Sequence, residues 1–476
     1  MDERISNVNL SRETLKGTTA KFVIAAIGFA GTIIFGRLLG PTSFGAYYEL
    51  LSLSQVGARP VAGWAGAAKK RFSEAGNRTQ EIVGANYLGT ILWVLGTLAL
   101  VITLSPLLEE YAGVKSASLL IALMLAPLAV FESLNVLVTG TGRVGTTKWI
   151  DALRSLLTFG TQLVLVVLGF GVFGMTVGFG VATLVTVPIL VWYLKIRPSV
   201  PSQKTVKSMW SYAKYSIPTG VVGMTYEQFD ILLLGALFTS DVTGQYKAVA
   251  VLTLPAFFVS EVASDGLMSK VSHNHSRGEA ISNDISNVLA FASIVSLPLL
   301  FGGAAVIEPL VTTVFGPNYA DATKFFLPLA VARVISTQTF PLYQAIEGID
   351  RPDISFRIGL ISLTVNVVIG IILALEIGPV GVVYATLIAE SFQYVLYHWT
   401  LSRNTTNIRF LTRPFAEQLV ASVIMYLVVH GLRTEVAVTG WMSLVGVIVV
   451  GGMIYFAILA VVSRQLRETV RAAFDI

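Results

Sequence analysis

Long apolar stretches follow one another along the whole sequence, and they constrain the fold more than any other feature. Only 13% of the 476 residues are charged and 54% are hydrophobic, with a mean hydropathy of +0.72. Soluble domains carry about a quarter charged residues, so much of this chain must face something other than water. A run of about 18 apolar residues can cross the hydrocarbon core as a helix. Because lipid leaves free backbone groups unpaired, the sequence predicts an all-α, polytopic membrane protein.

The hydropathy pattern predicts fourteen transmembrane helices with short connections between them. No connection is long enough to hold a folded domain outside the membrane. The predicted spans are 18–38, 44–66, 83–106, 116–138, 147–169, 173–194, 213–237, 245–268, 286–312, 323–345, 354–375, 380–401, 414–432 and 438–462.

The positions of Lys and Arg predict the orientation of these helices. Loops on one side hold 24 of the 33 basic residues, and loops on the other side hold five. Cytoplasmic loops carry such an excess, so both termini are expected in the cytoplasm, in a multi-pass protein of the plasma membrane. The net charge of +5 then reports orientation and not a nucleic-acid partner.

Two short patterns recur at nearly the same offset and predict an internal repeat. GAY at 45–47 matches GQY at 244–246, and the glycine-rich GVFG at 171–174 matches GPVG at 378–381. Both copies begin on the same side, so the repeat is parallel, with its axis along the membrane normal. The predicted domains are an N-lobe of helices 1–6 (1–200), a pseudo-symmetric C-lobe of helices 7–12 (201–402) and two added helices (403–476).

The first copy follows a sharp turn. Gly40 and Pro41 separate two apolar runs, and proline fixes its own φ and cannot continue the helix before it. We expect Gly45, and Gly244 in the second copy, to let the chain re-enter a helix close to its neighbour.

Four stretches resemble the polysaccharide flippases of the Wzx type, in the multidrug/oligosaccharidyl-lipid/polysaccharide (MOP) exporter superfamily, whose other members include MurJ and the MATE exporters. They are RLLGPTSFGAYYELLSLSQV, YEQFDILLLGAL with VTGQYKAVAVL, VFGPNYADATKFFLPLA and GPVGVVYATLIAE. They occur in the expected order and cover most of the chain. The resemblance implies a V-shaped bundle of two six-helix lobes with a cavity between them. The loop KKRFSEAG is most similar to archaeal members.

The resemblance also implies the activity, which is translocation of a lipid-linked oligosaccharide to the outer leaflet. Two matched lobes are the architecture that alternating access uses, and we expect coupling to an ion gradient. The expected partner is a glycan on a polyprenyl or dolichyl phosphate or pyrophosphate, with membrane lipid around a monomeric protein and no nucleic acid.

Ionisable residues at membrane depth are costly and therefore candidates for function. Arg59 is the first candidate for holding the lipid phosphate, because a guanidinium grips phosphate oxygens with two hydrogen bonds. Lys21, Lys214 and Arg37 are further candidates at helix ends, and the resemblance puts helices 1, 2, 7 and 8 around the cavity.

Each of these residues also has a structural interpretation. Lys21 and Lys214 could extend their ammonium groups to the interface, and Arg59 could pair with Glu49 or Glu261. For Arg154, a structural pair with Asp151 is the favoured interpretation. For the tyrosines near the hairpins, anchoring at the membrane interface is favoured over stacking on a sugar; they are Tyr47, Tyr48, Tyr226 and Tyr246.

Glu227 and Asp230 are three residues apart and share roughly one helix face. Two such carboxylates do not both ionise easily in a low dielectric, and a Na⁺ or H⁺ between them would relieve the repulsion. The resemblance implies a cation site among helices 7, 11 and 12, where Asn366 and Thr386 offer further oxygen ligands. The alternative is a hydrogen-bond network between helices. We expect no other metal and no cofactor.

Two other functions stay open. One is a MATE-like, cation-coupled exporter of small amphipathic compounds, and the other is a membrane-embedded polysaccharide polymerase or glycosyltransferase. An enzyme of that kind needs a catalytic cluster in a sizeable outward loop, and the outward loops are short and mostly uncharged. The lack of cysteine excludes thiolate nucleophiles and thiolate metal sites, and no phosphate-binding loop for ATP is present.

Overall fold

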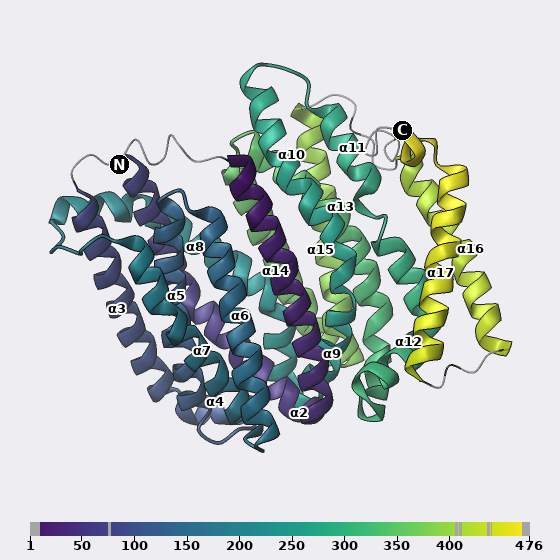
Figure 1. Ribbon diagram of the computed structural model, residues 1–476, viewed down its shortest axis with the longest axis horizontal. Helices are drawn as coiled ribbons and strands as arrows, with labels where there is room; N and C mark the ends of the chain where they lie inside the picture. The colour runs from purple at the N-terminus through teal and green to yellow at the C-terminus, as the bar shows by residue number, and fades with distance from the viewer. Residues whose placement is uncertain are drawn as a thin grey trace. The chain divides into compact units, whose positions relative to one another are not determined.

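The computed structural model describes residues 10–74, 78–404, 408, 412–435, 438 and 440–468, and these residues form helices and no strand (Figure 1). The helices before the loop at 238–239 are α2 (Leu10–Glu74), α3 (Thr79–Thr103), α4 (Ser105–Ala112), α5 (Ala117–Gly140), α6 (Val144–Val167), α7 (Gly171–Leu194) and α8 (Gln203–Leu237). Those after it are α9 (Ser240–Leu252), η1 (Leu254–Phe257), α10 (Phe258–Ser276), α11 (Ser282–Ala292), α12 (Ser296–Phe315), η2 (Pro317–Phe325), α13 (Phe326–Gly348), α14 (Pro352–Ile377), α15 (Pro379–Asn404), α16 (Arg413–Glu435) and α17 (Trp441–Val462).

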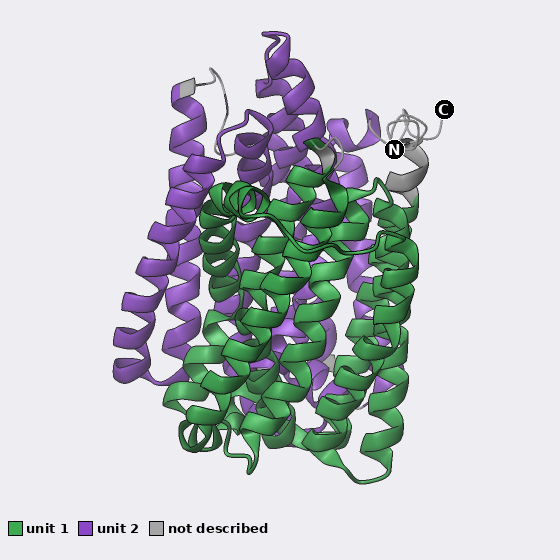
Figure 2. Ribbon diagram, turned by 90° about the vertical axis from the view of Figure 1, so that its left-hand side faces the viewer, with its two compact units in different colours: residues 1–244 green, residues 245–476 purple. Residues whose placement is uncertain are grey.

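Two compact units divide the chain, residues 1–244 and 245–476 (Figure 2). Unit 1 therefore keeps α8 and the first residues of α9. The six-helix lobes with a boundary at residue 200 stay a prediction. In unit 1, α2 packs along α5, α6 and α8. In unit 2, α13 packs on α10 and α15, α14 pairs with α15, and α12 packs on α16.

The long helix α2 is two helices joined at a sharp break. Gly40 has φ 72° and ψ 169°, which is not helical, and side chains other than glycine rarely adopt this φ. Pro41 follows at once as the first residue of the second half, where its missing N–H has no helical partner to lose. The break lies where the sequence predicts the turn.

Eleven helices among the described residues are long and apolar enough to cross a membrane, and a twelfth is formed if α9 and η1–α10, bent by 42°, make one span. In this count the two halves of α2 are one span, and α8, which is 35 residues long, is not included. Counting both halves of α2 and adding α8 gives a total consistent with the fourteen predicted spans. Many large apolar side chains on these helices are exposed, among them Ile102, Val167 and Leu375. The chain is a multi-pass membrane protein.

Three details of the helices differ from the prediction. The short helix α4 was not expected, the span predicted at 245–268 is bent around Pro255, and the span at 286–312 is two helices, α11 and α12. Proline explains the last break, since the ring of Pro298 removes the hydrogen bond that the carbonyl of Ile294 would accept and clashes with that carbonyl.

In unit 2, side chains from other helices donate hydrogen bonds to carbonyl groups that lack a helical partner because a proline follows four residues later. The hydroxyl of Tyr455 donates to the carbonyl of Ile294 at 3.0 Å. Arg433 Nη1 donates to Ala305 at 2.9 Å, four residues before Pro309, and Ser260 donates to Thr337 at 2.7 Å, four residues before Pro341. Each contact replaces a lost helical bond where lipid offers no water, so these carbonyls stay paired although their helices contain proline.

Candidate functional site

Arg59 lies where the second half of α2 packs closely against α8. Close approach is possible because Gly63 faces Ile217 and Gly220 faces Arg59, and a Cβ on Gly220 would lie 3.3 Å from Arg59 Nε. Two hydrogen bonds join the same helices. Ser216 donates to the carbonyl of Gly63 at 2.8 Å, and Ser52 of α2 donates to the side-chain oxygen of Gln228 on α8 at 2.8 Å. The position of Arg59 is therefore set by a packed helix pair.

Carboxyl groups on two other elements interact electrostatically with Arg59. They are Glu132 on α5 and Glu227 on α8. Within the described part of the chain, the guanidinium of Arg59 makes no hydrogen bond and no ion pair within 4.0 Å. We call Arg59, Glu132 and Glu227 the Arg59 cluster. It leaves the donors of a half-buried arginine available to an anionic ligand.

The pairing of Arg59 with Glu49 is not found. Glu49 is ten residues earlier in the same helical half, which corresponds to roughly 15 Å along the axis. Its carboxylate is fully buried and accepts a hydrogen bond from Ser240 at 2.8 Å. Glu261, the other alternative partner, belongs to unit 2.

The structural pair between Arg154 and Asp151 is confirmed. Arg154 Nη2 lies 3.7 Å from Asp151 Oδ1, Lys148 lies 3.7 Å from Asp151 Oδ2, and Asn135 donates to that carboxylate at 3.2 Å. These charges also act on Glu132, so α6 adds a second group of ionisable residues beside the Arg59 cluster.

The other predicted phosphate ligands lie at different places in unit 1. Lys21 is half-buried in the first half of α2, and Arg37 is exposed near the end of that half. Lys214 is exposed on α8, with its ammonium 4.9 Å from the ring centre of Tyr215.

The predicted cation ligands fall into two groups. Asp230 and Glu227 are on α8 in unit 1, where Asp230 is buried and Glu227 is exposed. Asn366 on α14 and Thr386 on α15 are in unit 2 and exchange hydrogen bonds of 3.3 Å. No cluster of three or more His, Cys, Asp or Glu suited to a metal occurs among the residues described.

The two copies of the repeated motif contact each other reciprocally in unit 1. A Cβ on Gly45 would overlap the carbonyl oxygen of Ser240, and a Cβ on Gly244 would overlap that of Pro41. Thr42 donates to Asp241 at 3.3 Å. We call this contact the glycine crossing. Its partners are related by the same offset of 199 residues as the motifs, which supports the repeat.

Interfacial anchoring is wrong for two of the tyrosines. Tyr47 and Tyr246 are buried, with 4% and 8% of their surface exposed. The hydroxyl of Tyr47 accepts a hydrogen bond of 2.9 Å from Gln162 on α6, which also donates to the carbonyl of Met175. Gln162 was not singled out in the sequence, although its spacing from Arg154 and Thr158 puts it on the same helix face.

Charged side chains held between the helices of a multi-pass membrane protein are typical of a transporter. Its fold is similar to the lipid II flippase MurJ in an inward closed conformation, at a TM-score of 0.81 and 15% identity, over 94% of this chain and 99% of that one. It is also similar to an inward-facing MATE multidrug transporter, at a TM-score of 0.62 and 14% identity, over 81% and 96%.

The chain belongs to the polysaccharide biosynthesis protein family, whose model matches residues 34–324. Two relatives from Haloferax volcanii match nearly the whole length. One is described as a probable low-salt glycan biosynthesis flippase, Agl15, 26% identical over 97% of this chain and 98% of the relative. The other, described as the probable flippase AglR, is 23% identical over 94% of each chain.

Proposed function

We propose that this protein is a flippase that moves a lipid-linked glycan from the cytoplasmic to the outer leaflet by alternating access. The family and the two full-length relatives described as flippases support this function. The observation that carries it is the Arg59 cluster, where a cation on a transmembrane helix keeps its hydrogen-bond donors available among the described residues. A phosphate or pyrophosphate leaving the headgroup layer needs such a partner, and a small cationic drug does not.

A deletion strain tests this function in the cell. Without the flippase, full-length lipid-linked glycan should accumulate on the cytoplasmic side and disappear from the outer surface, and the intact gene should reverse both changes. Accumulation of shortened glycans would instead indicate a polymerase or transferase, and an unchanged glycan lipid would rule out a role in its export.

The carrier is proposed to be a polyprenyl or dolichyl phosphate or pyrophosphate, and the protein to act as a monomer in the plasma membrane with both termini in the cytoplasm. The excess of basic residues on one side supports the orientation. Because the chain lacks cysteine, single-cysteine variants can be labelled without background. A membrane-impermeant maleimide should label Glu110→Cys and Thr239→Cys in intact cells, and Val200→Cys and Ser276→Cys only after lysis. The reverse pattern would invert the topology.

Coupling to Na⁺ or H⁺ through Asp230 is the second part of the proposal. A bound ion shifts a conformational equilibrium only by its difference in affinity between the two states. The Asp230→Asn variant loses the ionisable group, so its transport should no longer respond to a Na⁺ or proton gradient imposed on proteoliposomes. The matched control is Asp321→Asn, at an exposed aspartate of η2. Transport by Asp230→Asn that follows the gradient as in the wild type would remove Asp230 from coupling.

A further inference from the structure

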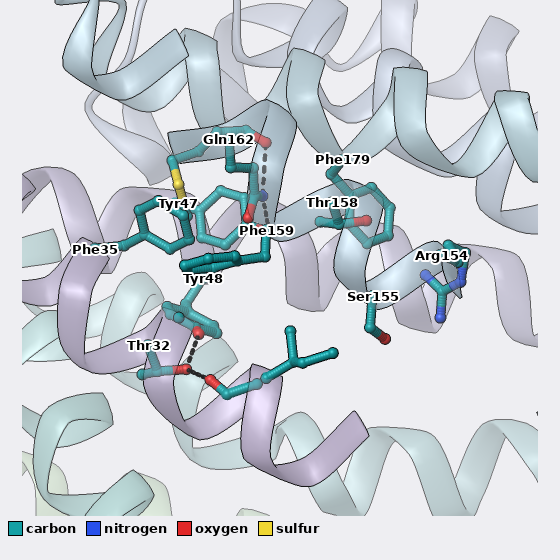
Figure 3. Close-up of a pocket in the computed structure, with 14 residues that line it drawn as sticks. Thr32, Phe35, Tyr47, Tyr48, Arg154, Ser155, Thr158, Phe159, Gln162 and Phe179 are labelled. Atoms are coloured by element: carbon teal, nitrogen blue, oxygen red, sulfur yellow. Dashed lines mark hydrogen bonds between the residues drawn. The ribbon is translucent and has the colours of Figure 1, made fainter. Parts of the chain in front are cut away.

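A pocket separate from the Arg59 cluster lies within unit 1, between the two halves of α2 and helices α6 and α7 (Figure 3). Its volume is about 180 Å³. Aromatic side chains line one part of it, including Phe35, Tyr48 and Phe159, and polar side chains of α6 line another, namely Arg154, Ser155 and Thr158. We call it the aromatic pocket.

The polar part of the pocket contains hydrogen-bonding atoms whose capacity is not used. Arg154 Nε and Thr158 Oγ1 are buried and have no hydrogen-bond partner within the described chain. Tyr48, by contrast, pairs with Thr32 at 3.1 Å. Buried polar atoms are nearly always paired, and leaving one unpaired costs stability. Both atoms belong to residues that line the pocket, where a bound polar group would supply the missing partners.

Charge argues against a phosphate as that ligand. The guanidinium of Arg154 lies 3.7 Å from the carboxylate of Asp151 and also interacts with Glu132, so two carboxyl groups already compensate its positive charge. Its remaining environment is aromatic, with the Phe131 ring centre 4.7 Å and the Phe179 ring centre 5.9 Å away. An uncharged group with hydroxyls suits this arginine better than a dianion.

Size and shape narrow the ligand further. Pockets for drug-sized molecules measure about 300–1,000 Å³, so this one accommodates a single ring and not a whole oligosaccharide. A pyranose has an apolar C–H face that packs on aromatic rings and a rim of hydroxyls that pair with polar side chains. A lipid chain would leave Arg154 Nε and Thr158 Oγ1 unpaired in an apolar environment.

We infer that the aromatic pocket binds one uncharged sugar ring of the transported glycan, apart from the phosphate at Arg59. This inference rests on the proposed flippase function. It concerns the glycan of the substrate, whereas the Arg59 cluster is proposed to bind the phosphate. The sugar would stack on Phe159 and receive hydrogen bonds from Arg154 and Thr158.

Binding to the purified full-length protein tests the inference without requiring transport. Native mass spectrometry in detergent compares dolichyl phosphate with dolichyl phosphate that carries glucose, mannose or galactose. The wild type should bind at least one sugar-bearing lipid about tenfold more tightly than dolichyl phosphate, as expected from roughly one hydrogen bond and one ring contact. The double variant Thr158→Val/Phe159→Leu should lose this preference and keep its affinity for dolichyl phosphate.

The matched control is Thr103→Val/Phe173→Leu, which makes the same changes at exposed sites of α3 and α7. It should bind all lipids as the wild type does. Equal losses for sugar-bearing and sugar-free lipids in the pocket variant would overturn the inference, and so would a wild type without any preference for a sugar. If the preference is present but proteoliposomes do not transport the lipid, the flippase proposal fails while the pocket stands.

Discussion

Gly45 and Gly244 have no room for a side chain, because each faces a backbone carbonyl from the other copy of the motif. The sequence showed that both glycines recur but not that they meet, since a repeat does not by itself reveal contacts between its copies. Likewise, the position of Arg59 within an apolar run showed that its charge is energetically costly in the membrane. Its neighbours Glu132 and Gly220 come from other helices and could be found only in the structure.

The glycine crossing gives a prediction for single substitutions. Gly45→Ala and Gly244→Ala should each lower the free energy of unfolding by about 1–3 kcal/mol, the usual cost of overpacking. Gly66 lies in the same helix as Gly45, and no other atom lies within 4 Å of a Cβ added there. Gly66→Ala should therefore be neutral or stabilising, because alanine favours the helical conformation. Thermal unfolding in detergent measures all three. Equal melting temperatures for the variants would mean that the crossing tolerates a methyl group.

At the scale of helices, the predicted spans are found to within a few residues at most ends, because apolar length is a local property. The bends were harder to predict. Pro298 and Pro309 were visible in the sequence, but the partners of the freed carbonyls, Tyr455 and Arg433, are more than 120 residues away. Such long-range contacts satisfy the carbonyls that the prolines leave without a helical partner.

Removing one of these partners should therefore destabilise unit 2. Tyr455→Phe keeps the buried ring but leaves the carbonyl of Ile294 unpaired, which costs about 1–3 kcal/mol. Tyr384→Phe removes a hydroxyl from an exposed ring and should have little effect. Chemical or thermal unfolding of the two variants compares them directly. A Tyr455→Phe protein as stable as the Tyr384→Phe protein would show that another group satisfies that carbonyl.

For the whole molecule, composition and hydropathy were sufficient to predict a multi-pass helical membrane protein. The likeness to polysaccharide flippases came from the resemblance of four stretches, and family membership agrees. The candidate site was predicted only in part. A phosphate site at Arg59 stays a prediction, and the structure adds the carboxyl groups of Glu132 and Glu227 beside it. The aromatic pocket does not follow from the sequence, because hydropathy favours the membrane interface for Tyr47 and Tyr48. Burial of a ring depends on the helices packed around it, which hydropathy does not report.

Transport by Arg59 variants in proteoliposomes tests the central claim most directly. The assay follows a dolichyl phosphate-linked sugar from one leaflet to the other. Arg59→Ala should reduce the rate at least tenfold, Arg59→Lys should retain part of it because charge remains without the guanidinium fork, and Arg277→Ala, at an exposed arginine after α10, should equal the wild type. Undiminished transport by a correctly folded Arg59→Ala protein would contradict a phosphate site at the Arg59 cluster.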